Sequence, residues 1–507
     1  AYFAAKMQHA LWHRVYITNQ KDTARARCRS FPALGHAQAS VAGKGVRRMS
    51  VFSLSNLKKT WYYLQKNGIR NAVWAVLERI GQEQEVYTWQ EPDEKTLSFQ
   101  REHSASLRIS IVVPAYRTKK EHLEAMLNSV SKQSYPHWEL IVADAGGTAE
   151  SVQAWAKKNG ICLRKAADAS NLAEWKDQSI MLCTLSENKG ISANTNAGIE
   201  LAAGDAVGLL DHDDLLTANA LWEMADCLEK EKKRGKQKLV LFSDEDKCDG
   251  AASRFYEPNF KPDFDGELLL TNNYICHFTV IETAFLKELK LRSGFDGAQD
   301  YDLMLRAYAA GGQFVHVPKV LYHWRCHEAS TASNPQSKRY AYEAGQRALE
   351  DYCLRKGWKA TVSGLKHLGF YREDYEDSVF CQRPEIGIWA KPLPGGRDIF
   401  GIRHPKGFLV SGLYENDGLM RYAGLRKGYS GPMHRAALQQ SAPAADLRSM
   451  EVCSALKERY AQTIAELKEA CQGLPTAAQE KKILQKSMEF CKEATAAGYG
   501  ILWDPQA

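Results

Sequence analysis

Two aspartates that could hold a metal ion follow an apolar run in the middle of the chain. Asp211 and Asp213 come directly after Val207–Leu210, which has the length and composition of a buried strand. Residues two apart in extended backbone point to the same side, so their carboxylates repel unless a cation is near. Carboxylate oxygens suit Mg²⁺ or Mn²⁺, and Mg²⁺ usually shares its shell with substrate phosphates. The pair predicts a divalent cation site. The plain alternative is that Asp214 or Thr217 caps the helix that follows.

A third carboxylate, Asp300, has the position of a general base. It stands at the start of an expected helix over Tyr301–Ala310, where the helix N-terminus favours the ionised form that a base needs. Removal of an acceptor proton by a positioned base is worth ~10²–10⁴-fold in rate. Two alternatives stay open: Asp300 is simply the helix N-cap, or Asp302 is the base.

The elements that would position these acids alternate between strand and helix over residues 108–325. Strands are expected over Arg108–Val113, Trp138–Ala143, Met181–Leu185, Asp205–Leu210 and Leu239–Ser243. Helices are expected over Glu121–Ser131, Ser151–Asn159, Ile191–Ala202 and Ala218–Arg234. This alternation predicts an α/β domain with a mainly parallel sheet, in which ligands bind beyond the carboxyl ends of the strands. Polar clusters follow three of the strands, at Pro114–Arg117, Asp144–Gly147 and Asp211–Asp214, so we expect one shared cleft.

The order and spacing of eight segments resemble glycosyltransferase family 2. The segments are ISIVVPAYR, ELIVADAGG, ENKGISANTNAGIELAAGD, VGLLDHDDLL, FSDEDK, PNFKPDFDGELLLTNNYICH, GFDGAQDYDLMLR and LYHWRCHEASTA. The resemblance covers about residues 55–370 and is closest to bacterial members that build O-antigen or rhamnan-type surface polysaccharide. It implies a GT-A fold, an inverting mechanism, a nucleotide-diphosphate-sugar donor and Mn²⁺ or Mg²⁺ as cofactor.

The resemblance also implies roles for individual residues. Asp300 matches the catalytic base, and Asp213, Asp211 and His327 match the metal ligands. Asp144 matches the aspartate that accepts from N3–H of a pyrimidine base, and the segment from His323 to His327 matches a loop that closes over the diphosphate. The donor-binding residues implied in this way are Pro114, Ala115, Tyr116, Asp144, Asn188, Gly190, Asn194, Asp211 and Arg325.

Some positions depart from the family pattern. Ala145 and Gln299 stand where the family often has acids, and Thr195 stands where it often has Arg. Because of these departures, the resemblance does not determine which residues around Asn194 contact the diphosphate. The acidic run over 244–246 resembles a family segment near the transferred sugar, with a solvated charge run as the alternative.

Composition narrows the class of protein. The chain has 507 residues, 44% hydrophobic and 25% charged, which is ordinary for globular domains, and no apolar run long enough for a transmembrane helix. Twelve cysteines without CxxC pairs favour reduced thiols in the cytoplasm over a zinc site. Residues 1–50 hold nine Lys or Arg and one Asp, which gives them a charge of +8. Because the whole chain has a net charge of +7, the remaining residues carry −1. A basic head on a near-neutral body does not favour a nucleic-acid partner.

The chain divides into four expected segments. Residues 1–54 form a basic head, of which 1–48 is either a native disordered arm or sequence upstream of a start at Met49. Residues 55–105 are an N-terminal helical segment, in which 55–81 is amphipathic and either lies on the inner face of a membrane or packs on the next domain. Residues 106–375 are the catalytic domain. Residues 383–507 are a shortened second transferase-like unit.

An internal repeat indicates the second unit. Asp302–Gly311 aligns with Glu489–Gly498, and Phe314–Pro318 with Ile501–Pro505. In this register Asp300 pairs with Ser487, and no DxD occurs between 383 and 507, so this unit is expected to be catalytically empty.

The sequence thus predicts a metal-dependent inverting glycosyltransferase that extends a surface glycan, lipid-linked in our interpretation. A catalytically inactive nucleotide-sugar or glycan-binding scaffold is the alternative, although a binder needs no base such as Asp300. A nucleotidyltransferase is disfavoured because the segment PAYRTKK after the first strand has no glycine to form a phosphate loop.

Overall fold

The computed structural model describes residues 87–166, 176–326, 339–364, 369–376, 378–390, 420–421, 450–470, 486, 489–490, 493–494 and 496–503. The predicted basic head and the amphipathic stretch 55–81 therefore lie outside the described residues, as does His327. In the described part of the chain, none of the helices has the length and hydropathy needed to cross a bilayer.

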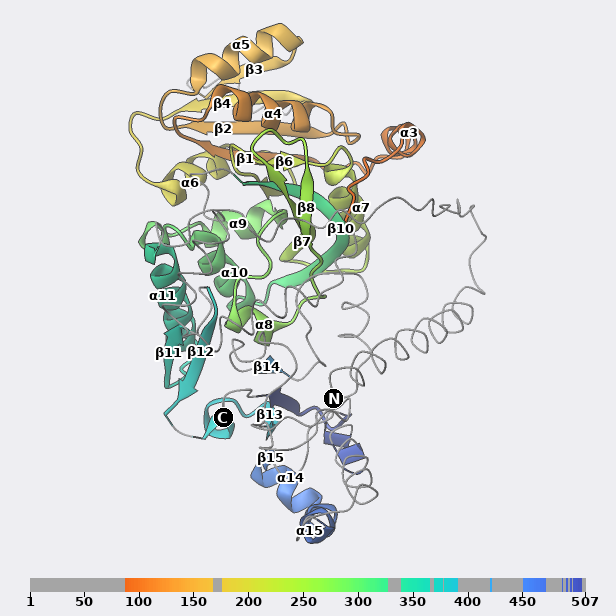
Figure 1. Cartoon of the computed structure of the whole chain (residues 1–507), viewed down its shortest axis with the longest axis vertical. Coiled ribbons are helices and arrows are strands. Elements are labelled where there is room, and N and C mark those ends of the chain that lie inside the picture. Colours follow the sequence, from red (N-terminus) through yellow and green to blue (C-terminus); the bar gives the residue numbers. More distant parts are fainter. Residues whose placement is uncertain are drawn as a thin grey trace, which may run out of the picture. The chain divides into compact units, whose positions relative to one another are not determined.

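One large sheet organises residues 109–326 (Figure 1). Its strands lie in the order β3-β4-β2-β1-β5-β9-β7-β10-β6, and β8 pairs with β7. The strands from β3 to β5 are all parallel, β9 is antiparallel to both neighbours, and β10 is parallel to β7. The α/β architecture predicted from the sequence is confirmed. The strands are β1 Ile109–Ala115, β2 Trp138–Asp144, β3 Cys162–Lys165, β4 Ser179–Thr184, β5 Ala206–Leu209, β6 Leu215–Leu216, β7 Leu239–Asp249, β8 Phe255–Asn259, β9 Thr279–Glu282 and β10 Gln313–Cys326.

Helices cover both faces of this sheet because its central strands are apolar on both sides. Ile111 and Val113 of β1 belong to one buried core, and Val112 between them belongs to the other. Each fully buried side chain of this size stabilises the fold by ~1.5–3 kcal/mol relative to an exposed one. The first core is closed by α4 Lys120–Ser131, α5 Ala149–Asn159 and α7 Ala220–Lys233. The second is closed by α6 Ile191–Leu201, α8 Gly266–Thr271, α9 Thr283–Leu289, α10 Gln299–Ala309 and α11 Arg339–Arg355, of which α10 and α11 lie side by side (Figure 1).

One strand, β7, is longer than predicted, and another, β10, was not predicted; both bring polar residues into the sheet. β7 continues through the acidic run 244–246, whose three side chains are buried, so the interpretation as a solvated charge run is wrong. β10 contains His323–Arg325, which the resemblance assigned to a loop. The polar residues of β7 and β10 satisfy one another across the sheet, and hydrophobic patterning could not reveal such pairs. The short elements α3 Glu94–Glu102 and η3 Ser293–Phe295 complete this region.

The chain continues into a hairpin and a second, small sheet. The hairpin pairs β11 Ala360–Gly364 with β12 Tyr371–Tyr375 and is followed by α12 Val379–Gln382. The small sheet has the order β14-β16-β13-β15, and its elements are β13 Ile386–Ala390, β14 Met420–Arg421, β15 Met450–Val452, β16 Gly500–Trp503, α14 Ser454–Arg459 and α15 Ala461–Ala470. β16 is parallel to β13 and follows helical residues, as β10 is parallel to β7 and follows α10. This arrangement is compatible with the repeat, and a degenerate second transferase unit stays a prediction.

Candidate active site

The carboxyl ends of β1 and β2 form one wall of the candidate site. Their register pairs Ala115 with Asp144, so the residues that follow leave the sheet side by side. Tyr116 is 39% exposed, and a Cβ added to Gly146 would lie 3.6 Å from its ring. Pro114, predicted to line the nucleotide, is the last but one residue of β1. An exposed aromatic side chain beside a carboxylate offers a surface on which a base could stack.

Asp144 is buried and holds the turn that leads into α5. Its Oδ1 accepts from the backbone N–H of Gly146 (3.1 Å) and of Thr148 (3.2 Å), and its Oδ2 accepts from Ala149 (2.9 Å). A carboxylate has about four lone-pair sites, so these three bonds leave capacity for one further donor. The position agrees with a ligand-facing wall, and recognition of a pyrimidine stays a prediction.

The loop before α6 is fixed by two asparagines. Asn188 Oδ1 accepts from the Gly190 N–H (3.1 Å) and from the side-chain amide of Asn194 (2.8 Å). Gly190 has φ of 95°, and a Cβ there would lie 2.2 Å from Asp296 Oδ2. The backbone conformation therefore favours glycine, and a larger residue would also displace the Asp296 carboxylate. Donor contacts by these three residues stay predictions.

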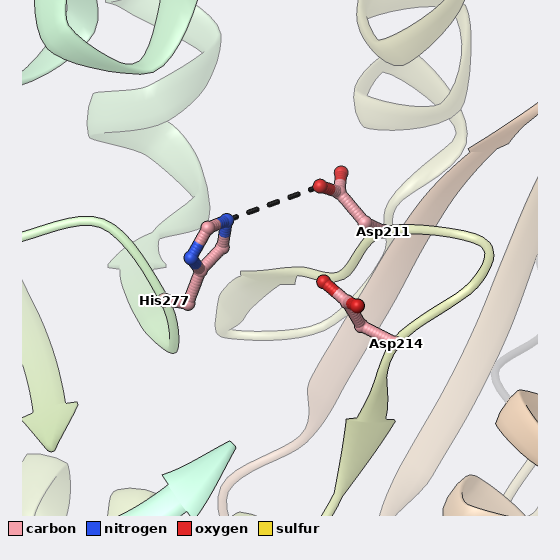
Figure 2. Close-up of side chains that lie close together, drawn as sticks. All are labelled: Asp211, Asp214 and His277. Atoms are coloured by element: carbon pink, nitrogen blue, oxygen red, sulfur yellow. Dashed lines mark ion pairs between the residues drawn. The ribbon is translucent and has the colours of Figure 1, made fainter. Parts of the chain in front are cut away.

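A candidate metal centre forms where the loop after β5 meets the segment before β9. One ligand atom each from Asp211, Asp214 and His277 lies within 4.8 Å of the others, and Figure 2 shows the imidazole facing the two carboxylates. His277 Nε2 lies 3.9 Å from Asp211 Oδ2. That distance exceeds a hydrogen bond, but two metal–ligand bonds of about 2.1 Å each can span it. The oxygen-rich donor set fits a divalent cation such as Mn²⁺ or Mg²⁺.

This group differs from the predicted ligand set. It includes Asp211 as expected, but Asp214 and His277 in place of Asp213 and the undescribed His327. Asp214 is not a helix cap, because α7 begins after Asn219.

Asp214 is instead fixed by β10. The Tyr322 hydroxyl donates to its Oδ2 (2.5 Å), and the backbone N–H of Arg325 donates to its Oδ1 (2.7 Å). Burial raises the pKa of Asp211 and of Asp214, and the negative charges of neighbouring aspartates raise both further. A bound cation would supply the positive charge that favours both ionised carboxylates.

Arg325, predicted to bind the donor, is buried beneath the aspartate loop. Its Nε donates to the carbonyl oxygen of Asp213 (2.5 Å), and its Nη1 donates to that of Gly250 (2.8 Å). Its buried Nη2 has no hydrogen-bond partner among the described residues. Arg325 therefore fixes the loop that carries the aspartates, and only Nη2 remains for a ligand.

His277 is supported from behind by β7 and β10. Its Nδ1 lies 3.1 Å from Glu245 Oε2, and its ring stacks on Tyr322 at 4.7 Å between centroids. Burial alone would lower the pKa of His277, but Cys276 and the Glu245 carboxylate raise it above its usual range. Burial alone would raise the pKa of Glu245, but Lys261 and His277 hold it below its usual value. The histidine and the glutamate thus stabilise each other's charged form.

Asp300 lies in the first turn of α10 and is partly exposed. The Asn273 side-chain amide donates to its Oδ2 (2.8 Å), and its charge acts on the carboxyl group of Asp211. The interpretation of Asp300 as the helix N-cap is wrong, because the N-cap position belongs to Ala298.

Asp302 is buried in a network of arginines. Its carboxylate accepts from Arg292 Nε (3.1 Å) and Arg306 Nε (2.9 Å), and Arg292 also bridges to Asp351. These bonds make Asp302 a structural residue and leave Asp300 as the candidate base.

The outer acids of the run 244–246 are paired with histidines. Asp244 contacts His316 Nε2 at 2.9 Å, and Asp246 contacts His323 Nδ1 at 2.5 Å. His323 therefore packs and hydrogen-bonds within the sheet, rather than lying in a loop over the diphosphate.

Three residues of the site were not predicted from the sequence: Lys261, Asn273 and His277. All three lie in the segment PNFKPDFDGELLLTNNYICH, which helped to establish the family resemblance. All three lie outside the helices and strands, so only the fold shows that they meet the aspartates.

Comparisons with known proteins match part of the chain to a family model and to several relatives. Residues 110–289 match the model of "Glycosyl transferase family 2". The chain is 36% identical over 255 residues to the uncharacterised protein y4gI of Sinorhizobium fredii, covering 50% of this chain and 26% of that protein. It is 34% identical over 256 residues to the O-antigen biosynthesis protein RfbC of Myxococcus xanthus, covering 50% of this chain and 19% of that one. The chain thus spans only a part of these relatives' length. A structure of S. aureus TarS with UDP-GlcNAc aligns with a TM-score of 0.37 at 20% identity, covering 49% of this chain and 67% of TarS.

Proposed function

Because residues 110–289 form a glycosyltransferase family 2 domain, we propose that this chain moves a sugar from a nucleoside-diphosphate donor to a hydroxyl group of a growing surface polysaccharide. The proposal includes an inverting mechanism, a divalent cation, a donor such as dTDP-rhamnose or a UDP-sugar, and a lipid-linked acceptor. The name of the Myxococcus relative, an O-antigen biosynthesis protein, supports a polysaccharide acceptor.

The observation that carries the proposal is the meeting of a cation-binding group with a separate carboxylate. Asp211, Asp214 and His277 supply the first, and Asp300 supplies the second, close enough for its charge to act on Asp211. A sugar transfer needs both: positive charge for the leaving diphosphate and a base for the incoming hydroxyl.

The cation would be held by Asp211, Asp214 and His277, with Asp213 as the further ligand that the resemblance implies. When bound, it neutralises the charge that develops on the leaving diphosphate. Arg325 positions the carbonyl of Asp213, and Tyr322 positions Asp214, so the loop is organised before any ligand arrives.

Asp300 would act on the acceptor. Its carboxylate takes the proton of the acceptor hydroxyl while that oxygen forms a bond to the anomeric carbon of the donor. The bond from that carbon to the diphosphate oxygen breaks on the opposite side, which inverts the configuration. Asn273 holds Oδ2 of Asp300 and thereby fixes the direction of the carboxylate.

The donor nucleotide would lie along the wall formed by Tyr116 and Asp144. The Tyr116 ring would stack on the base, and the remaining acceptor capacity of Asp144 would receive the N3–H of a pyrimidine. Asn188, Gly190 and Asn194 would shape the loop on the diphosphate side.

We assign the reaction to the cytoplasm, with the chain peripheral to the inner membrane through the amphipathic stretch 55–81. Both assignments rest on the sequence.

The test is release of nucleoside diphosphate from UDP-sugars and dTDP-sugars, with and without a polyisoprenyl-linked glycan acceptor. We expect Mn²⁺-dependent release that an acceptor increases, a chelator abolishes, and Asp300→Asn lowers by ~10²–10⁴-fold. Nucleotide-sugar binding with no release above the Asp300→Asn level would contradict transfer and favour the binding scaffold.

A further inference from the structure

His277 can serve as a metal ligand only if its imidazole is held in one orientation and one tautomer. The Nδ1 side contacts Glu245 Oε2 at 3.1 Å, and the Nε2 side faces Asp211 (Figure 2). A carboxylate acceptor keeps the proton on Nδ1, so a cation that binds Nε2 takes the place of the second ring proton. Glu245 therefore has the contact that selects the metal-binding tautomer.

The backbone that carries His277 is held by a buried lysine. Lys261 is fully buried, and its Nζ donates to the carbonyl oxygens of Ile275 (3.1 Å), Cys276 (2.7 Å) and His277 (2.5 Å). An ammonium group has three donors, and three consecutive carbonyls accept them. His277 itself has φ of 55°, an uncommon conformation for a residue other than glycine. The three bonds hold this segment in that conformation.

Glu245 and Lys261 also contact each other. Lys261 Nζ lies 3.7 Å from the same Glu245 oxygen, Oε2, that contacts His277. A charge that is taken out of water is costly unless it is paired and hydrogen-bonded. This pair satisfies that requirement, and it holds both the ring and the backbone of one histidine.

We propose that Lys261 and Glu245 are positioning residues for the metal centre, which hold His277 with Nε2 toward Asp211 and Asp214 so that it coordinates the cation. The proposal rests on the cation site of the proposed function, which already includes His277, and adds to it the two residues that position that histidine. Neither Lys261 nor Glu245 touches the cation or the substrate in this account.

Electron paramagnetic resonance of bound Mn²⁺ tests the proposal without measuring transfer. Electron spin-echo modulation detects nitrogen bound directly to Mn²⁺, and we expect that signal in the full chain. It should disappear in His277→Gln while weaker Mn²⁺ binding at the carboxylates persists. In Lys261→Met the nitrogen signal should be lost or reduced, with a 10–100-fold weaker Mn²⁺ affinity, as is typical for residues behind metal ligands.

Two substitutions of different severity test the role of Glu245. Glu245→Gln keeps an oxygen that can accept from Nδ1, whereas Glu245→Leu removes the acceptor. We expect Glu245→Gln to retain most of the nitrogen signal and Glu245→Leu to lose it. Equal signals in the two variants would contradict the assigned role of Glu245.

Arg306 offers a matched control for loss of a buried cation. It also donates to consecutive carbonyl oxygens, those of Leu289 (2.6 Å) and Lys290 (2.5 Å), and it also pairs with a carboxylate, Asp302. Arg306→Met should lower the melting temperature as Lys261→Met does, yet leave the nitrogen signal of the folded protein unchanged.

The outcomes separate this proposal from the proposed function. Mn²⁺ binding with no nitrogen signal in the wild type would overturn the assignment of His277 but leave the transferase intact. An unchanged nitrogen signal in folded Lys261→Met would overturn the positioning role alone. Absence of any Mn²⁺ binding would instead contradict the cation site on which both depend.

Discussion

Asp300 and Asp302 stand two residues apart in α10, yet their surroundings give them different tasks. Asp300 is partly exposed and takes one bond from Asn273, whereas Asp302 is buried between Arg292 and Arg306. We expect Asp300→Asn to lower transfer by ~10²–10⁴-fold with unchanged nucleotide affinity and melting temperature. Asp302→Asn should lower stability by about 3–5 kcal/mol, because it breaks a buried ion pair. Steady-state kinetics and chemical denaturation measure the two effects, and reversed results would assign the base to Asp302.

Tyr322 contacts two residues of the candidate metal centre, Asp214 and His277. Its hydroxyl donates to Asp214, and its ring stacks on His277. Tyr322→Phe keeps the ring and removes the hydroxyl, which leaves an oxygen of a buried carboxylate short of one donor. We expect a loss of about 1–3 kcal/mol in stability without metal and weaker Mn²⁺ binding, measured by thermal unfolding with and without Mn²⁺. Wild-type Mn²⁺ affinity in Tyr322→Phe would contradict a structural link between the hydroxyl and the cation site.

At the scale of elements, β12 carries a buried carboxyl group, Glu373, that makes the stability of the fold depend on pH. Burial raises the pKa of Glu373 from 4.5 to about 8, and neither of its oxygens has a hydrogen-bond partner among the described residues. The unfolded chain ionises near pH 4.5, but the folded chain stays protonated up to about pH 8. Unfolding therefore releases a proton in this window, and stability falls as the pH rises through it.

Glu373→Gln should remove this loss of stability with rising pH. We expect the variant to be more stable than the wild type at pH 8, by on the order of 1–4 kcal/mol, and the difference to shrink toward pH 5. Denaturation with urea at several pH values measures it. The neighbouring Asp374 has a side chain that is 55% exposed and pairs with Arg372, so Asp374→Asn is the matched control and should show no such trend. A constant offset across the pH range for Glu373→Gln would contradict the assignment.

The strands and helices that the sequence did predict in the large sheet have simple apolar patterns. Ile111, Val112 and Val113 are continuous because β1 is buried on both faces, and the buried residues of α4 recur at helical spacing. The acidic half of β7 and the His323–Arg325 end of β10 were not predictable in this way. Their polar residues are buried as cross-strand partners, and such pairing depends on the tertiary fold.

The site residues that lie at or just after the ends of strands were predictable from the sequence. Asp144 is the last residue of β2, and Asp211 lies two residues beyond the end of β5. The edge of the sheet therefore positions both. His277 and Lys261 lie in irregular segments around α8, and their contacts depend on the path of the chain between β8 and β9. The resemblance drew attention to this segment, but the role of each residue comes from its contacts.

At the scale of the whole molecule, every described residue of the candidate site lies in the large sheet, in its helices or in the segments that connect them. Arg383, which follows α12, forms a buried two-bond ion pair with Glu267 of α8, the helix that precedes Asn273 and His277. We therefore expect a chain that ends at Glu385 to keep Mn²⁺-dependent nucleotide binding close to that of the full chain.

A chain that ends at Asp377 is the control for this truncation. It loses Arg383 and leaves the buried carboxylate of Glu267 without its arginine partner, at a cost of about 3–5 kcal/mol. Calorimetry and thermal unfolding of both truncated chains measure the difference. Loss of nucleotide binding in the longer truncated chain, if it remains folded, would show that the segment after 385 contributes to the site.

One edge of the large sheet is proposed to bind a nucleoside diphosphate together with a divalent cation. The most direct measurement is isothermal titration of UDP and dTDP into the full chain, with Mn²⁺ and with a chelator, for the wild type and Asp211→Asn. We predict binding of at least one nucleotide that requires Mn²⁺ and is lost or strongly weakened in Asp211→Asn. Binding that is equally tight with the chelator, or unchanged in Asp211→Asn, would contradict the metal centre. No binding of either nucleotide to the folded wild type would contradict the donor site itself.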